Sequence, residues 1–421
     1  MTAPPTAGSA TAESATAAPA SGKAATKHVF QADMVRVLTF ACVIAVHTVS
    51  TVNPLDSVPG GAVVMLLHFT REAFFILTAF VLMHRYRVSS LRVAPFWRRR
   101  FLLVGVPYVV WSVIYTGLGL VTAPLAPADA ATTLLRNLLT GTAWFHMYFL
   151  LVSMQFYLVF PVFRWLLRAT RGHHLLLLTG SALLQVAIDL WLHDPAPTGT
   201  KADLLPYLGS FLLSYQFFLV LGGIVALHLD RVEAWIRGHP VLVVAGFVLT
   251  GAAAEGWYWW SIVQGVGAQF ATDVFQPLMI PWSVAVVAVF FVIGSAWSDR
   301  RAGGRFSRMV EGASDRSFGV FLVHPAILWA VTVAGVDSPA AQLTPPWSSF
   351  AAYAVAVVGS LLIVEVLQRT PLATPLTGRP QRSQLVPRWL VGRAQLRRRA
   401  WKAAGHEERN DDRHPVGPAR T

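Results

Sequence analysis

The stretch MVRVLTFACVIAVHTVSTV, residues 34–52, decides the fold of this chain. It holds two basic side chains, Arg36 and His47, and no acidic one. At about 1.5 Å per residue, a helix of this length crosses most of the roughly 30 Å hydrocarbon layer of a membrane. Backbone groups in lipid must hydrogen-bond to one another, so the stretch predicts a transmembrane helix.

Nine further apolar stretches of similar length follow it. Of the 421 residues, 54% are hydrophobic and 13% are charged, about half of the roughly 25% in a typical soluble domain. This composition excludes an ordinary soluble enzyme and a disordered protein, and the single cysteine, Cys42, excludes a disulfide scaffold. We therefore predict an all-α, polytopic membrane bundle of about ten transmembrane helices. The nine further spans are 62–83, 101–121, 144–163, 174–192, 207–228, 240–258, 280–297, 317–335 and 347–367.

Arginine residues alternate from loop to loop between these spans. The loops after the second, fourth, sixth and eighth spans are rich in arginine, whereas the opposite set carries only Arg136 and Lys201. Basic loops stay in the cytoplasm, so both termini are predicted to be cytoplasmic, in a bacterial cell membrane. The net charge is +13, but the arginine residues between the tails lie in short clusters between apolar stretches, as membrane topology requires, so no nucleic-acid partner is expected. The arginine-rich loops hold Arg85, Arg87, Arg92, Arg98, Arg99, Arg100, Arg164, Arg168, Arg171, Arg231, Arg237, Arg300, Arg301, Arg305, Arg308 and Arg316.

The two ends of the chain differ from the spans. Residues 1–30 are rich in Ala, Thr, Ser and Pro and predict a disordered tail. Residues 31–368 form the predicted transmembrane domain. Residues 369–421 hold eleven Arg and one Lys against four acids and predict a basic cytoplasmic tail. Within it, residues 387–402 fit either a helix on an anionic membrane surface or a solvated basic segment.

Ionisable side chains inside the spans are functional candidates, because they are costly in hydrocarbon. Arg36 and His47 lie eleven positions apart, within about 20° of three full helical turns, so they share one face about 16 Å apart. Asp33, one turn before Arg36, is a possible ion-pair partner. The alternatives are an Arg36 that reaches the inner headgroups and a His47 that only packs. The other candidates are His68, Arg71, Glu72, His146, His324 and Glu365.

Arg71 and Glu72 are neighbours deep in the second span. Adjacent helical residues point about 100° apart, so we expect each to find its partner on another helix rather than in the other. A purely structural charge network is the alternative.

Five segments then resemble one family, the acyltransferase 3 family of integral membrane proteins. DMVRVLTFACVIAVH (33–47) resembles its first-span signature, an Asp-x-x-Arg followed by a His. FFILTAF (74–80) is similar to its Phe-Phe-x-x-Ser-Gly-Phe segment, and FWRRRFLLVGVPYVVWS (96–112) to its basic third-span start. HMYFLLVSMQFYLVFP (146–161) and SFGVFLVHP (317–325) resemble two later segments. The five occur in the family's order and cover roughly residues 30–367.

Two segments depart from the family pattern. Thr78 and Ala79 stand where the family has Ser-Gly, which reduces backbone freedom in the second span. The family's further arginine in the third span has no counterpart, since residues 102–104 are Leu, Leu and Val. The second departure weakens any assignment of a fixed arginine pair to donor binding there.

The resemblance implies an O-acyltransferase that moves an acyl group, commonly acetyl, from cytoplasmic acyl-CoA to a hydroxyl. The acceptor is an envelope glycan, a lipid-linked sugar or a small glycoside. His47 would be the general base or a transient acyl carrier. Glu72 would orient His47, and Arg71 would stabilise negative charge on the reacting oxygen. Arg36 would join these catalytic residues, at a position where an anionic CoA pyrophosphate or a partner carboxylate approaches from the cytoplasm. The resemblance further implies substrate binding by Asp33, Arg98, Arg99, Arg100, His146, Tyr148 and His324. No metal and no permanently bound cofactor are expected.

Two other classes fit the same sequence features. Ten spans with intramembrane charges also suit a polysaccharide or lipid-linked sugar exporter, although the two halves show no obvious duplication. A membrane scaffold that presents its basic tail to partners is the other alternative. Acyl-CoA consumption that depends on an acceptor distinguishes the enzyme from both.

Overall fold

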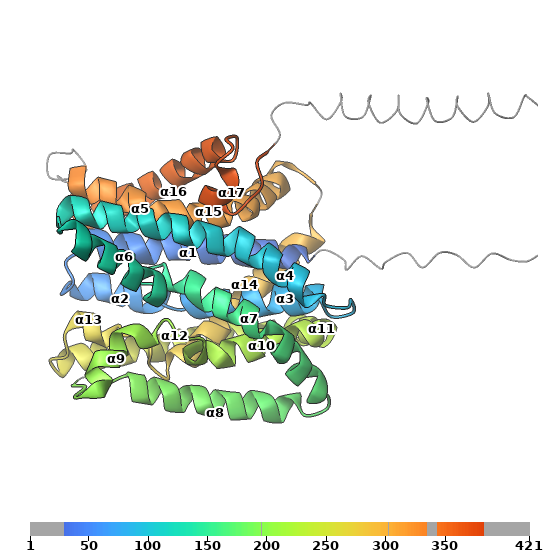
Figure 1. Ribbon diagram of the computed structural model, residues 1–421. Coiled ribbons are helices and arrows are strands. Elements are labelled where there is room, and N and C mark those ends of the chain that lie inside the picture. The colour runs from blue at the N-terminus through green and yellow to red at the C-terminus, as the bar shows by residue number, and fades with distance from the viewer. Residues whose placement is uncertain (1–28, 195, 302, 335–342, 383–421) are drawn as a thin grey trace, which may run out of the picture.

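The computed structural model describes residues 29–194, 196–301, 303–334 and 343–382, and these ranges contain helices and no strand (Figure 1). The predicted all-α bundle is therefore confirmed. In chain order the helices are α1 (Phe30–Val52), α2 (Val58–Leu67), α3 (Thr70–Arg85), α4 (Val93–Arg100), η1 (Phe101–Gly105), α5 (Val106–Thr122), α6 (Pro127–Thr140), α7 (Tyr148–Ala169), α8 (His174–Leu192), α9 (Thr200–Leu208), η2 (Leu212–Tyr215), α10 (Gln216–Leu227), α11 (Leu229–Gly238), α12 (Pro240–Val263), α13 (Ala268–Ala271), α14 (Met279–Asp299), α15 (Arg305–Ala334), α16 (Trp347–Leu367) and α17 (Ala373–Thr377).

The number of membrane crossings agrees with the sequence. Among the described residues, nine helices are long and apolar enough to span a membrane, and a tenth is formed if the bent pair α9 and Leu212–Leu227 counts as one span. Each of the ten predicted spans overlaps one of them. The protein is thus a multi-pass membrane protein.

Three of the spans are interrupted. The second span breaks at His68 and Phe69, between α2 and α3. The third continues from α4 through a single π-helical stretch, η1, into α5. The sixth bends by 58° between α9 and the helix that follows it. Backbone groups freed by a helix break inside the membrane are tolerated where other parts of the protein cover them or where they line a cavity. π-Helical stretches frequently mark functional sites.

Several predicted span boundaries are wrong, and two of them bear on the site. The fourth span was expected over 144–163, but α7 begins at Tyr148, because residues 144–150 form tight i→i+3 turns such as Met147 N–H to the Trp144 carbonyl. His146 therefore lies in the turn before α7. The ninth span was expected over 317–335, but α15 begins at Arg305, since hydropathy detects only the apolar part of a helix.

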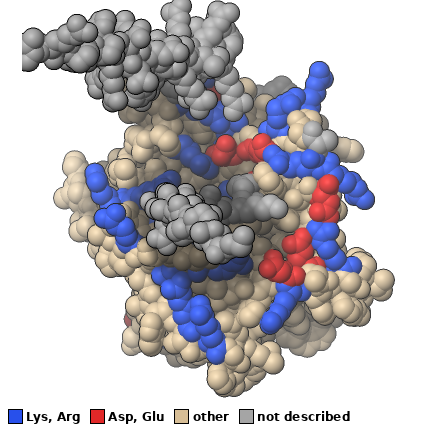
Figure 2. All heavy atoms as spheres, turned by 90° about the vertical axis from the view of Figure 1, so that its right-hand side faces the viewer, with Lys and Arg blue, Asp and Glu red and all other residues tan. Residues whose placement is uncertain are grey.

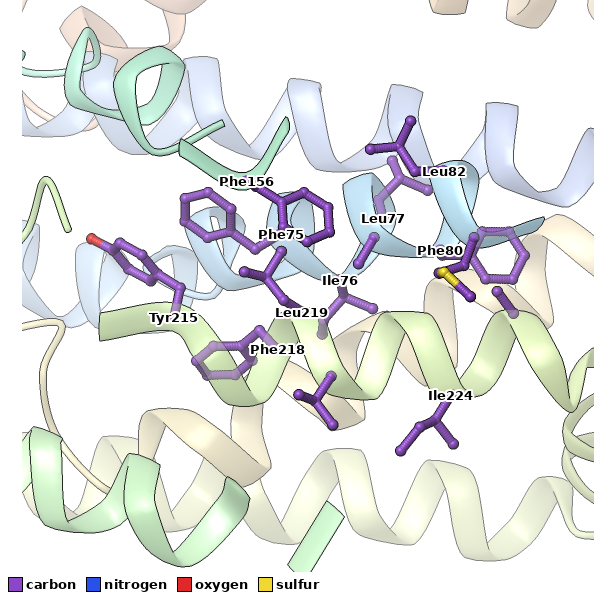
Figure 3. Close-up of a cluster of buried hydrophobic side chains, with 14 of the residues drawn as sticks. Phe75, Ile76, Leu77, Phe80, Leu82, Phe156, Tyr215, Phe218, Leu219 and Ile224 are labelled. Carbon is purple, nitrogen blue, oxygen red and sulfur yellow. The ribbon is translucent and has the colours of Figure 1, made fainter. Parts of the chain in front are cut away.

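α3 lies at the centre of the bundle and packs closely on α10 (Figure 3). The ring of Phe75 stacks on Tyr215, with centroids 4.3 Å apart. Gly222 faces the backbone of Ile76, and a Cβ placed on it would lie 2.1 Å from the Ile76 carbonyl oxygen. Small residues let transmembrane helices approach in this way. The contact holds α3 rigidly beside α1 and α7, which carry the site described next.

Arginine side chains gather at one end of the bundle, the right-hand end in Figure 1, which faces the viewer in Figure 2. We call it the basic end. Arg164 donates to the carbonyls of Tyr86 and Ser89, and Arg168 donates to that of Arg87, so α7 holds the loop that follows α3. Arg237 pairs with Asp299 at the same end. The described chain starts and finishes at this end, as an even number of crossings requires (Figure 1).

Candidate functional site

A cavity of about 700 Å³ extends from the basic end into the bundle. We call it the arginine pocket. Residues of α1, α3, α4, α7 and α15, together with residues 378–380, line it. Its charged lining is mainly positive, which suits an anionic ligand. The charged residues of the lining are Asp33, Arg36, Arg85, Arg99, Arg100, Asp315 and Arg379.

Arg36 is held in the pocket by a hydroxyl bridge. Ser314 on α15 donates to Asp33 Oδ1 at 2.8 Å and accepts from the Arg36 guanidinium at 3.3 Å. The predicted association of Asp33 with Arg36 thus runs through a third residue. Arg100 lies over the rings of Tyr157 and Phe96, at 5.5 Å and 5.8 Å from their centroids. Such cation–π contacts fix a guanidinium without neutralising it.

His47 lies further along the same face of α1 and contacts the same partner helix. Its Nδ1 is 2.8 Å from Nε2 of His324 on α15, and the two rings are parallel. Arg36 thus contacts Ser314, and His47 contacts His324. The spacing of the two residues on α1, eleven positions, nearly equals that of their partners on α15, ten positions. α1 and α15 run parallel and in contact over this length, and the shared face predicted from the helical phase is confirmed.

The hydrogen bonds determine the tautomers of this pair. His324 Nδ1 lies 3.1 Å from the Val320 carbonyl, which can only accept, so His324 carries its proton on Nδ1. In the neutral pair, His324 Nε2 is then an acceptor, and His47 must donate from Nδ1. The lone pair of His47 is therefore on Nε2, which makes no hydrogen bond to another described residue. His47 is partly exposed, whereas His324 is fully buried.

His146 completes a cluster of three histidines. Its ring centroid is 6.5 Å from that of His47 and 5.8 Å from that of His324. The side chain is buried against Tyr115, whose hydroxyl donates to the Leu322 carbonyl. Neither ring nitrogen of His146 has a hydrogen-bond partner among the described residues. A buried polar group without a partner is costly, so His146 is available to bind a ligand group.

A single layer of aromatic rings separates the arginine pocket from the histidine cluster. Phe40, Phe74 and Phe149 line the pocket. Phe321 packs on Phe40 and Phe149 on one side and on the ring of His146, 5.0 Å away, on the other. A ligand that fills the pocket therefore ends one side chain away from His146 and His324, the two neighbours of His47 in the cluster.

The structure changes the interpretation of Arg71 and Glu72. Contrary to the expectation of separate partners, the Arg71 guanidinium donates to Glu72 Oε1 through Nε at 3.0 Å and through a terminal nitrogen at 2.8 Å. Extended side chains overcome the 100° between adjacent positions. The carboxylate thus binds Arg71, and His47 is oriented by His324 and not by Glu72 as predicted. Arg71 also lies over the rings of Tyr215 and Phe275.

The remaining predicted residues belong neither to the arginine pocket nor to the cluster of three histidines. Tyr148 lies beside Arg71. Arg98 is exposed and does not line the arginine pocket, unlike Arg99 and Arg100. Glu365 pairs at the basic end with Arg316 and Arg369. His68, at the break between α2 and α3, lies close enough to His47 to interact with it electrostatically.

Several residues of the site were missed by the sequence analysis. Ser314 and Tyr115 carry no charge and resemble ordinary packing residues. Arg379 lies in a segment that its composition assigns to the basic tail. Asp189 belongs to neither site but acts electrostatically on the Arg71–Glu72 pair; buried near the end of α8 and bonded to Gln185, it was detectable as an acidic residue inside an apolar span.

The match to known proteins agrees with this arrangement. The model of the acyltransferase 3 family, described as an acyltransferase domain, matches residues 30–365. The chain belongs to this family. No curated protein and no solved structure matches the chain. The matched range contains the histidine cluster and most of the arginine pocket of this acyltransferase 3 protein, but it ends before residues 378–380, which complete the pocket wall.

Proposed function

We propose that this protein transfers an acyl group, acetyl in the simplest case, from cytoplasmic acyl-CoA to a hydroxyl. The acceptor is an envelope glycan, a lipid-linked sugar or a small glycoside. The observation that carries the proposal is the histidine cluster, in which His47 bonds to His324 and which begins one layer of rings beyond a pocket lined by arginines. Family membership supports an acyl-transfer reaction.

The positive charge of the arginine pocket supports a position for the anionic donor there. Its phosphates bind Arg36, Arg99 and Arg100, and its long flexible arm runs inward past Phe40 and Phe74 toward the histidines. Because basic loops stay in the cytoplasm, the basic end faces the compartment that contains acyl-CoA. A site about 16 Å deeper along α1 brings the thioester toward the opposite side of the membrane.

Transfer then proceeds at His47. Nε2 takes the proton of the acceptor hydroxyl, whose oxygen attacks the thioester carbonyl carbon. The tetrahedral intermediate breaks its C–S bond, and the CoA thiolate takes the proton back from His47, leaving an ester and free CoA. His324 accepts from His47 Nδ1 throughout and stabilises the imidazolium that forms. The same lone pair also suits a transient acyl-imidazole, attacked in turn by the acceptor.

The test measures thiol release from acetyl-CoA by the protein in lipid vesicles, with and without a crude envelope-glycan fraction. Wild type is compared with His47→Ala and with His239→Ala, a control at an exposed histidine whose side chain, among the described residues, hydrogen-bonds to the Trp235 carbonyl. We expect glycan-stimulated release by wild type and the control, and a loss of at least about 100-fold with His47→Ala.

Two results would contradict the proposal. Full release by the His47→Ala variant would remove that residue from the chemistry. Absence of release with every acyl donor and acceptor tested, combined with glycan flux across the vesicle membrane, would favour an exporter instead.

A further inference from the structure

Residues beyond the family match fold back onto the bundle. The Arg382 N–H donates to the Gln368 carbonyl at 2.9 Å, and the Gln381 side chain donates to the Arg369 carbonyl at 3.0 Å. In the sequence between these hydrogen-bonded residues lies α17, which packs on α5 and α15. The indole N–H of Trp111 on α5 donates to the Leu376 carbonyl at 3.0 Å. Residues 373–380, which we call the strap, are therefore a part of the folded domain.

The strap reaches the arginine pocket through a glycine that no other residue can replace easily. Gly378 has a left-handed backbone conformation, with φ of 63°. A Cβ on it would lie 2.4 Å from the Phe318 ring and 2.5 Å from the Leu103 carbonyl oxygen. Leu103 belongs to the π-helical stretch η1. The chain thus turns directly against the pocket wall, and this turn places Arg379 and Pro380 in the lining.

Arg379 is free to bind an anion there. Its only ion pair among the described residues is a long one, 3.5 Å to Asp315, and both side chains are well exposed to water. An exposed pair at this distance contributes little stability, so a phosphate can compete for the guanidinium. Arg36 is held by Ser314, the residue next to Asp315, so Arg379 and Arg36 lie near one another in the pocket lining.

We propose that Arg379, presented by the strap, is a donor-binding residue that contacts a phosphate of acyl-CoA. This inference rests on the proposed function and adds a residue outside the family-matched range to its donor site. The nucleotide of acyl-CoA carries a 3′-phosphate and a pyrophosphate. Their negative charge exceeds the positive charge of three arginines, Arg36, Arg99 and Arg100. Arg379 adds a further guanidinium from the strap, at the basic end of the pocket, where it would contact the nucleotide rather than the acyl group.

The test separates binding from catalysis. We expect Arg379→Ala to raise KM for acetyl-CoA roughly 10-fold and to leave kcat within about twofold, because the residue lies far from the histidines. Arg379→Lys should recover part of the loss. The control is Arg382→Ala, which removes a neighbouring arginine that pairs with Glu365 and does not line the pocket. Its KM should stay that of wild type.

Direct binding of adenosine 3′,5′-bisphosphate, followed by calorimetry on the full-length protein in lipid nanodiscs, gives a second readout. The Arg379→Ala variant should bind it roughly 10-fold more weakly than wild type. A wild type that turns over acetyl-CoA, with unchanged KM and unchanged nucleotide affinity in Arg379→Ala, overturns the inference alone. A wild type that neither consumes acetyl-CoA nor binds the nucleotide overturns both the inference and the proposed function.

Discussion

At the scale of single residues, the site depends on which nitrogen of a histidine carries the proton. The Val320 carbonyl fixes the proton of His324 on Nδ1, and that choice fixes the proton of His47 on Nδ1 as well. In the proposed reaction His324 therefore acts as a positioning residue, whereas the family resemblance implies a substrate-binding one. The Val320 carbonyl thus acts through His324 on His47. It leaves the lone pair of His47 on Nε2, the nitrogen without a hydrogen-bond partner among the described residues.

This assignment predicts a loss in turnover when His324 is replaced. His324→Ala should lower kcat about 100-fold or more, because His47 loses both its orientation and the acceptor that stabilises its protonated form. KM for acetyl-CoA should change little, since the arginine pocket is intact. His324→Gln, whose amide oxygen accepts from His47 Nδ1, should recover part of kcat.

The measurement is steady-state kinetics of both variants, together with the pH profile of kcat. A merely structural role predicts equal losses in the Ala and Gln variants, with an unchanged pH profile. That outcome would assign His324 to packing.

At the scale of the elements, the site is built between α1 and α15 and supported by α3. The two parallel helices place arginine against serine near the basic end and histidine against histidine further in. α3 carries Phe74 of the aromatic layer and is held from behind by α10 through the Gly222 contact. Movement of α3 would therefore disturb the layer of aromatic rings that separates the arginine pocket from the histidine cluster.

The α3–α10 contact predicts an asymmetric response to glycine substitution. Gly222→Ala places a methyl group against the Ile76 carbonyl and should destabilise the protein by about 1–3 kcal/mol. Gly246→Ala in α12 is the matched control, since a Cβ there meets no atom within 4 Å. It should be neutral or slightly stabilising, because alanine is the better helix former.

Thermal unfolding of the two purified variants in detergent checks this expectation. Equal melting temperatures for Gly222→Ala and Gly246→Ala would show that α3 and α10 do not pack as closely as described.

At the scale of the whole molecule, the bundle is electrically polarised. Arginines gather around one end (Figure 2), and the cavity lined by five of them extends inward from that end. Positive loops and a cavity for an anion thus share one side. The orientation in the membrane decides which compartment supplies the ligand.

This polarity predicts the labelling pattern of introduced cysteines. In a Cys42→Ser background, Ser90→Cys lies in a loop at the basic end, and Thr198→Cys lies in the segment between α8 and α9. A membrane-impermeant maleimide should label Thr198→Cys in intact cells and Ser90→Cys only after permeabilisation. The reverse pattern would place the arginine pocket outside the cytoplasm, away from acyl-CoA, and would contradict the proposed donor.

The sequence by itself determined the membrane class, the number of crossings, the family and the shared face of Arg36 and His47. These follow from local quantities, namely hydropathy over about 20 residues, charge in the loops and the helical period. The π-helical stretch and the start of α7 were not predictable in this way, because hydropathy is insensitive to where hydrogen bonds change from i+4 to i+3 or i+5.

Only the tertiary structure decided which polar groups meet. Adjacency along a helix argued against an Arg71–Glu72 pair, yet burial among the rings of Tyr215 and Phe275 leaves each charge the other as its partner. The link from His47 to His324 spans 277 positions, and composition assigned Arg379 to a tail. Such contacts depend on how separate helices pack, which is a property of the assembled core and is not present in any one segment.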